Sequence, residues 1–142
     1  MPHAEHRVTI NRSAADVFEY LADGEKSTGW RTGVVEIKRV SGDGLGAQFK
    51  QLVRGPGGRA VAADYRISEF TPNSTLAFET TAGPVRPRGR YVLAESDGGT
   101  TVTFSLDAEL TGLKRLIMGG MVNRTMASEV RAIEKVKGIL EN

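Results

Sequence analysis

The sequence predicts a single α+β domain over residues 1–142, in which a seven-stranded antiparallel sheet is covered on one face by a long C-terminal helix. The length of 142 residues is about that of one domain. Between residues 33 and 110, short runs of alternating apolar and polar residues are separated by turn residues, which is typical of a sheet with one buried face. Between residues 113 and 140, apolar residues recur at helical spacing without a proline.

The first 30 residues predict a strand followed by one or two short helices. Residues 7–11 alternate as a strand does. Ser13 is a suitable N-cap for a helix of about three turns, because its hydroxyl can accept a hydrogen bond from a free amide of the first turn. Asp23-Gly24 ends this helix, and residues 24–29 allow a second short helical turn that leads to Trp30. The apolar side of the first helix consists of Val17, Phe18 and Leu21.

Six further strands are predicted from period-two alternation between glycine- and proline-containing turns. The clearest is the last, in which Val102, Phe104 and Leu106 face one way while threonine and serine face the other. The predicted ranges are 33–40, 46–53, 59–70, 75–82, 85–95 and 100–110.

The C-terminal helix is predicted over residues 113–140, with a length of about 40 Å at about 1.5 Å per residue. Gly119-Gly120 interrupts its good helix formers, and each glycine costs about 1 kcal/mol relative to alanine. We therefore expect the helix to weaken or kink in its first third.

Composition excludes several classes of function. The chain has no cysteine, and its two histidines, His3 and His6, lie near the N-terminus, so we expect no disulfide, no thiolate nucleophile, no metal site and no cofactor. Nineteen basic against 17 acidic residues give a formal charge of +2, too close to balance to indicate a nucleic-acid partner. The glycine-rich segment 42–46 lies between two strands and lacks the lysine of a phosphate-binding loop, so it is predicted to be a turn.

The chain is expected to be a soluble, cytoplasmic protein without membrane insertion. Its opening segment is polar and lacks the apolar stretch of a signal peptide. The longest nearly apolar run, residues 116–122, is far shorter than the ~20 residues that span a bilayer.

The order of the predicted elements resembles that of the START-like, Bet v 1-like (SRPBCC) superfamily, in particular its bacterial polyketide cyclase/dehydrase and lipid-transport proteins. The resemblance covers essentially the whole chain and implies a helix-grip fold, in which a curved sheet wraps around the terminal helix and leaves an apolar cavity between them. The segments that carry it are VTINRSAADVFEYLAD, Trp30, GAQFKQLV, ADYRISEFTPNSTLAFET, GRYVLAESDGGTTVTFSLDAEL and the amphipathic C-terminus.

Strand parity places five aromatic residues and Gln51 on the face that the family's geometry turns toward the terminal helix. A few polar groups in an apolar pocket are how ligand sites are usually built. Plain core packing is the alternative for each residue, and the methionines near Gly119-Gly120 suit either a cavity mouth or an irregular core. The predicted ligand-binding residues are Trp30, Phe49, Gln51, Tyr65, Phe78, Tyr91, Phe104, Met118, Met121 and Val122.

Catalysis has little support in the sequence, and no catalytic residue is assigned. Tyr65 and Tyr91 are weak candidates for donors to a developing negative charge. Arg90 faces the other way unless a bulge re-aims it, and its neighbours Arg86 and Arg88 suit a solvated strand face. By parity, the carboxylates Asp64, Asp107 and Glu109 fall on the polar face.

These observations favour a protein that binds a small, largely apolar ligand, such as a lipid, polyketide or aromatic metabolite, as a carrier or sensor. One alternative is a polyketide cyclase/dehydratase that uses the same cavity. A second is a protein-interaction module with a filled core. Whether the chain is an enzyme stays open, with binding favoured, and it is expected to be a monomer or homodimer.

Overall fold

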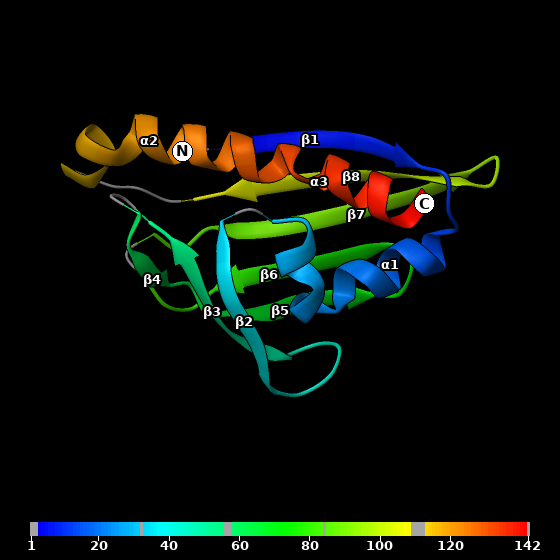
Figure 1. Cartoon of the computed structure of the whole chain (residues 1–142), viewed down its shortest axis with the longest axis horizontal. Coiled ribbons are helices and arrows are strands. Elements are labelled where there is room, and N and C mark those ends of the chain that lie inside the picture. Colours follow the sequence, from blue (N-terminus) through cyan, green and yellow to red (C-terminus); the bar gives the residue numbers. More distant parts are fainter. Residues whose placement is uncertain (1–2, 32, 56–57, 84, 109–112, 142) are drawn as a thin grey trace.

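The structure, a computed structural model, describes residues 3–31, 33–55, 58–83, 85–108 and 113–141, and only the backbone of 113–119 and 121 (Figure 1). Its elements follow the predicted order. They are β1 (His3–Ile10), α1 (Ala14–Ala22), the 3-10 helix η1 (Gly24–Gly29), β2 (Val34–Ser41), β3 (Gln48–Arg54), β4 (Ala60–Ala62), β5 (Tyr65–Thr71), β6 (Thr75–Thr80), β7 (Arg88–Ser96), β8 (Gly99–Asp107), α2 (Leu113–Arg131) and α3 (Ile133–Glu141).

The predicted helix-grip α+β fold is confirmed. Seven strands follow one another in the order β1-β8-β7-β6-β5-β3-β2, and β4 adds a short eighth strand that pairs with β3. Every described strand pair is antiparallel. Figure 1 shows α2 and α3 one after the other along one side of the curved sheet, beside β1, with α1 and η1 on the near side below α3.

The segment predicted as one strand over 59–70 is instead two strands, β4 and β5, and that part of the prediction was wrong. Both pair with β3, β4 through residues 52–54 and β5 through residues 48–49. Between them, the Asp64 carboxylate accepts a hydrogen bond from the main-chain N–H of Gln51 at 3.1 Å. The main-chain N–H of Ala63 donates to the main-chain carbonyl of Gln51 at 2.8 Å. A carboxylate thus replaces the main-chain acceptor that a regular β-ladder would supply to Gln51. The ladder with β3 is therefore interrupted between β4 and β5. Asp64 itself is half-buried.

The terminal helix is interrupted at a different place from the one predicted. α2 is continuous through Gly119-Gly120, since a cost of about 1 kcal/mol per glycine lowers helix stability without by itself ending a helix. The break lies at Ala132, whose amide is shared between the carbonyls of Ser128 and Glu129 at 3.2 Å each. α3 then starts as a separate helix.

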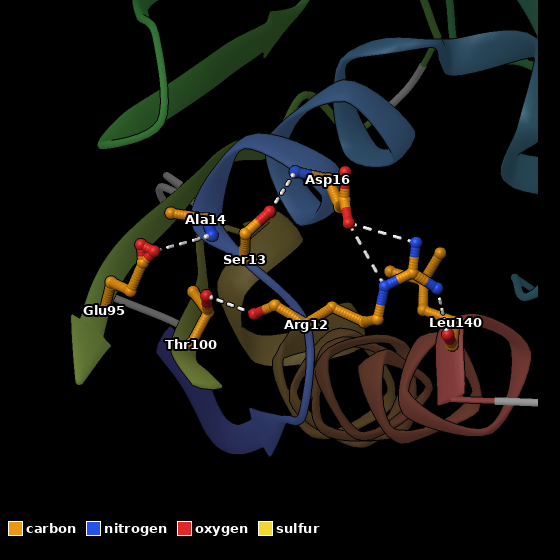
Figure 2. Close-up of polar contacts among 7 residues, drawn as sticks. All are labelled: Arg12, Ser13, Ala14, Asp16, Glu95, Thr100 and Leu140. Atoms are coloured by element: carbon orange, nitrogen blue, oxygen red, sulfur yellow. Dashed lines mark hydrogen bonds and ion pairs between the residues drawn. The ribbon is translucent and has the colours of Figure 1, made fainter. Parts of the chain in front are cut away.

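The turn between β1 and α1 holds the end of α3 in place (Figure 2). Ser13 caps α1 as predicted, since its hydroxyl accepts from the Asp16 amide at 3.2 Å. Arg12 donates to the Asp16 carboxylate at 3.0 Å and to the carbonyl of Leu140 at 2.5 Å, while its own carbonyl accepts from the Thr100 hydroxyl at 2.8 Å. One arginine therefore joins β8, α1 and the last turn of α3.

The start of η1 rests directly on the inner face of the sheet at Gly24. A Cβ atom at this position would lie 2.2 Å from the Tyr65 hydroxyl oxygen and 2.8 Å from Cε2 of Phe49. Both rings are themselves buried in the core, so an added methyl group would have to displace packed side chains.

We expect Gly24→Ala to lower the free energy of unfolding by about 1–3 kcal/mol, because the added methyl overpacks a buried contact. Denaturant unfolding measures the loss. Gly33→Ala is the matched control, since a Cβ there meets nothing within 4 Å, and its effect should stay within about 0.5 kcal/mol. Equal losses in the two variants would contradict the close contact at Gly24.

Candidate functional site

Six aromatic side chains form one continuous group on the inner face of the sheet, which we call the aromatic row. Successive ring centroids are 4.9 Å apart for Phe49–Tyr65, 5.3 Å for Tyr65–Phe78, 6.4 Å for Phe78–Tyr91 and 4.3 Å for Tyr91–Phe104. Trp30, just after η1, packs edge-on against Tyr91 and Phe104 at 6.4 and 6.1 Å. The row runs from β3 through β5, β6 and β7 to β8, so it crosses most of the sheet.

Phe78 is the member of the row that keeps accessible surface. The other five are buried, whereas Phe78 in the middle of the row is only half-buried. Gly89 lies opposite it on β7, and a Cβ at Gly89 would be 2.2 Å from the Phe78 ring. The glycine lets the ring lie flat against the neighbouring strand, and the inner face of the sheet keeps an accessible aromatic surface at its centre.

A buried ion pair lies beside the row. The Nε of Arg31, the residue after Trp30, donates to the Glu129 carboxylate of α2. Nη1 of Arg31 donates to Oε1 of Gln51 at 2.9 Å, and Nε2 of Gln51 donates to the Ala63 carbonyl at 2.9 Å. The side chains of Arg31 and Glu129 are only 12% and 20% exposed. We call Arg31, Gln51 and Glu129 the polar triad.

The electrostatics of this region keep its groups in defined protonation states. Burial would lower the pKa of Arg31, but the Glu129 carboxylate, the two tyrosines and the hydrogen bond together raise it, so Arg31 stays charged. Burial raises the pKa of Tyr65 to about 12 and that of Tyr91 further, against the opposing effect of Arg31. Both hydroxyls are therefore protonated near neutral pH and can donate hydrogen bonds.

A sequence model of the family described as polyketide cyclase / dehydrase and lipid transport matches residues 1–136. The chain belongs to this family. No curated protein matches it significantly in sequence.

Solved structures share the fold at low sequence identity. TTHA0849 from Thermus thermophilus is 18% identical with a TM-score of 0.82, the match covering 96% of this chain and 95% of that one. A START superfamily protein from Mycobacterium smegmatis is 14% identical with a TM-score of 0.79, covering 98% and 97% of the two chains. The Zhui aromatase/cyclase from Streptomyces sp. R1128 is 18% identical with a TM-score of 0.67, covering 96% and 88%.

The resemblance to the START-like superfamily and its polyketide cyclase branch is therefore confirmed. The family description names polyketide cyclases, dehydrases and lipid transport, and the solved structures show that the chain shares their fold. In the described residues, no helix is long and apolar enough to cross a membrane.

The structure brings most of the predicted ligand-binding residues together. The six aromatic residues form the row, Gln51 is in the polar triad, and Val122 is buried in the same core from α2. The side chains of Met118 and Met121 lie outside the described residues, as does Glu109. Whether any of these residues contacts a ligand stays a prediction.

The residues that sequence analysis missed are Arg31 and Glu129. Glu129 lies three residues after the buried Met126 and four before the buried Ile133, a spacing that places it on the inner side of the helix. This spacing is visible in the sequence, but the sequence does not indicate which residue would pair with a carboxylate at this position. Arg90, considered for the interior, is exposed and pairs with Glu69 at 3.1 Å.

We expect Glu129→Gln to lower the free energy of unfolding by about 3 kcal/mol, because it leaves the Arg31 charge buried without a counter-charge. Replacing both partners, Arg31→Met with Glu129→Leu, should cost clearly less than the sum of the two single changes. Glu79→Gln removes the exposed pair with Arg66 and is the control, with an expected loss below about 1 kcal/mol. Additive losses at Arg31 and Glu129, measured in a double-mutant cycle, would show that the two charges are not coupled.

Proposed function

We propose that this protein binds a small, largely apolar ligand, such as a lipid, polyketide or aromatic metabolite, as a carrier or sensor. The apolar body of the ligand lies on the aromatic row, and its polar end meets the polar triad. The observation that carries the proposal is the row itself, a continuous aromatic surface with accessible area at Phe78 and a hydrogen-bonding group at its side.

The aromatic row supports binding because its members share one face and do not interdigitate with another sheet. Phe78, the accessible ring, offers dispersion contacts and offset stacking to planar or aliphatic ligands, and the buried rings beside it fix its position. When a ligand covers Phe78, the half-buried ring in the middle of the row, its remaining accessible area is removed from water. This burial contributes about 25 cal/mol of binding free energy per Å² of apolar surface.

The polar triad favours a ligand whose end is polar but uncharged. Glu129 already neutralises Arg31, so a ligand carboxylate would meet both an attractive and a repulsive charge. A guanidinium has further N–H donors besides the two that Glu129 and Gln51 accept from, and a carbonyl or hydroxyl oxygen can take one of them. The two tyrosine hydroxyls add donors on the same face.

The test is a titration with Nile red, a neutral apolar dye whose own emission reports an apolar environment. We expect a Kd of about 1 μM and a quenched or shifted emission of Trp30, which is buried against Tyr91 and Phe104. Tyr65→Trp should block dye binding, followed by dye emission, while the protein stays folded by circular dichroism. Arg66→Met, on the outer face of the same strand, is the control and should bind as the wild type does. If Nile red does not bind the wild-type protein, a protein-interaction module with a filled core becomes the better explanation.

A polyketide cyclase/dehydratase is the second candidate, and Arg31 with the two protonated tyrosines is what favours it. Such donors can stabilise the enolate oxygen that develops when a poly-β-ketone cyclises. In that case Tyr65→Phe and Tyr91→Phe should each slow turnover of a polyketone analogue by about tenfold or more, with little change in its affinity. A pure carrier shows no turnover of the analogue, and the same changes alter affinity alone.

A further inference from the structure

A second candidate site is a groove that runs along α1. It has a volume of about 490 Å³ and lies between α1, the β2–β3 turn and the β5–β6 turn. Its floor is apolar and consists of Ala15, Phe18, Ala22, Ala47, Ile67 and Phe70.

An irregularity in β5 builds this floor. The pairing of β5 with β6 shifts register between Ile67 and Glu69, so Phe70 comes to the inner side where strict alternation would place Glu69. Phe70 then packs edge-on against Phe18 of α1, with ring centroids 5.1 Å apart and planes at 81°. Phe18 is buried, while Phe70 keeps accessible surface toward the groove.

The groove is separate from the aromatic row. No member of the row is among the residues that line it. Between the two, the start of η1 lies so close to Tyr65 and Phe49 that not even a methyl group fits at Gly24. A molecule in the groove is therefore in contact with α1 and the two turns, and not with the surface proposed above for the apolar ligand.

The rim of the groove is acidic. Glu19 and Asp23 line it from α1 and its C-cap, and Asp43 lines it from the β2–β3 turn. Of the described lining residues, Arg39 carries the one positive charge, and its Nη1 is bound to Asp43 at 3.3 Å and to the Gly42 carbonyl at 3.2 Å.

The end of α1 adds to this negative potential. α1 ends at Ala22, which lines the groove, and it has no basic residue in its last turn. The unpaired carbonyls at a helix C-terminus carry a partial negative charge that favours a cation. The helix end and the carboxylates thus act on the same space.

We propose that this groove is a binding site for a small organic cation, an amine whose ammonium group meets the acidic rim and whose apolar body covers Phe18 and Phe70. The volume suits a molecule of a few fused or linked rings. This site is independent of the proposed apolar-ligand site, and either can exist without the other.

Three probes with one body and different charge test the proposal: 2-naphthylmethylamine, 2-naphthylmethanol and 2-naphthoate. Amide shifts in ¹H–¹⁵N spectra should move for residues of the groove, such as Ala22, Gly44 and Asn73. We expect the amine to bind about fivefold more tightly than the alcohol, with the acid weakest, and the difference to shrink as salt is raised. The Nile red titration reports the interior site separately, so a failure of one site is not read as a failure of the other.

Two variants separate the charge from the apolar floor. Glu19→Gln with Asp43→Asn should remove most of the preference for the amine over the alcohol, whereas Glu36→Gln on β2, outside the groove, should leave it unchanged. Ala15→Trp, at an exposed position of α1, should fill the groove and abolish the shifts for all probes without unfolding the protein. Equal affinity of the three probes at the groove amides, or no shift there with any of them, would overturn the proposal.

Discussion

The ion pair between Arg31 and Glu129 is the interaction on which the arrangement of the interior depends. It joins two residues 98 positions apart, one at the end of the early helical segment and one on the terminal helix. Two charges in a largely buried place cost several kcal/mol each in desolvation, and the cost is offset only when the geometry is good and the other hydrogen bonds are made. Gln51, held by the Ala63 carbonyl, supplies one of those bonds. The pair therefore favours one position of α2 over the sheet, whereas apolar contacts alone would tolerate several.

α3 and the last turn of α2 are fixed by different kinds of contact. At α3, Arg12 donates to the main-chain carbonyl of Leu140, Lys137 donates to that of Thr9 on β1, and Glu141 accepts from the Asn11 main-chain amide at 2.7 Å. At the last turn of α2, the tie is the buried pair with Arg31. Ala132 separates the two regions. Its amide is shared between two carbonyls, and the regular helical hydrogen bonding changes there. Because of this break, α2 and α3 can take slightly different directions, and each can make its own contacts. A straight helix of the same length could not do this.

Much of the fold could be predicted from the sequence, because it depends on local periodicity. Strand parity correctly placed Phe49, Tyr65 and Tyr91 on one face, and Ser13 caps α1 as expected. The errors arose where a tertiary contact overrides alternation. The Asp64 carboxylate divides the strand predicted over 59–70, and the register shift after Ile67, for which no prediction was made, turns Phe70 inward. Neither the strand break nor the register shift can be seen in the alternation of the sequence, since each depends on a partner on another strand. The pairing of Arg31 with Glu129 could not be predicted for the same reason, and neither residue was assigned to the interior from the sequence.

The chemistry of the polar triad explains why binding is a better conclusion than catalysis. Proton abstraction from a substrate needs a base, and the carboxylate beside Tyr91 and Arg31 is Glu129. That carboxylate is already engaged with Arg31, so using it as a base would separate a buried ion pair and leave Arg31 without its counter-charge. The tyrosines cannot take over this role, since burial raises the pKa of Tyr65 to about 12 and keeps both hydroxyls protonated. What the site offers without rearrangement is a set of hydrogen-bond donors beside an aromatic surface. Under the proposed function, such a site would recognise an oxygen-bearing apolar molecule, and it would accelerate only a reaction whose substrate supplies its own reactivity.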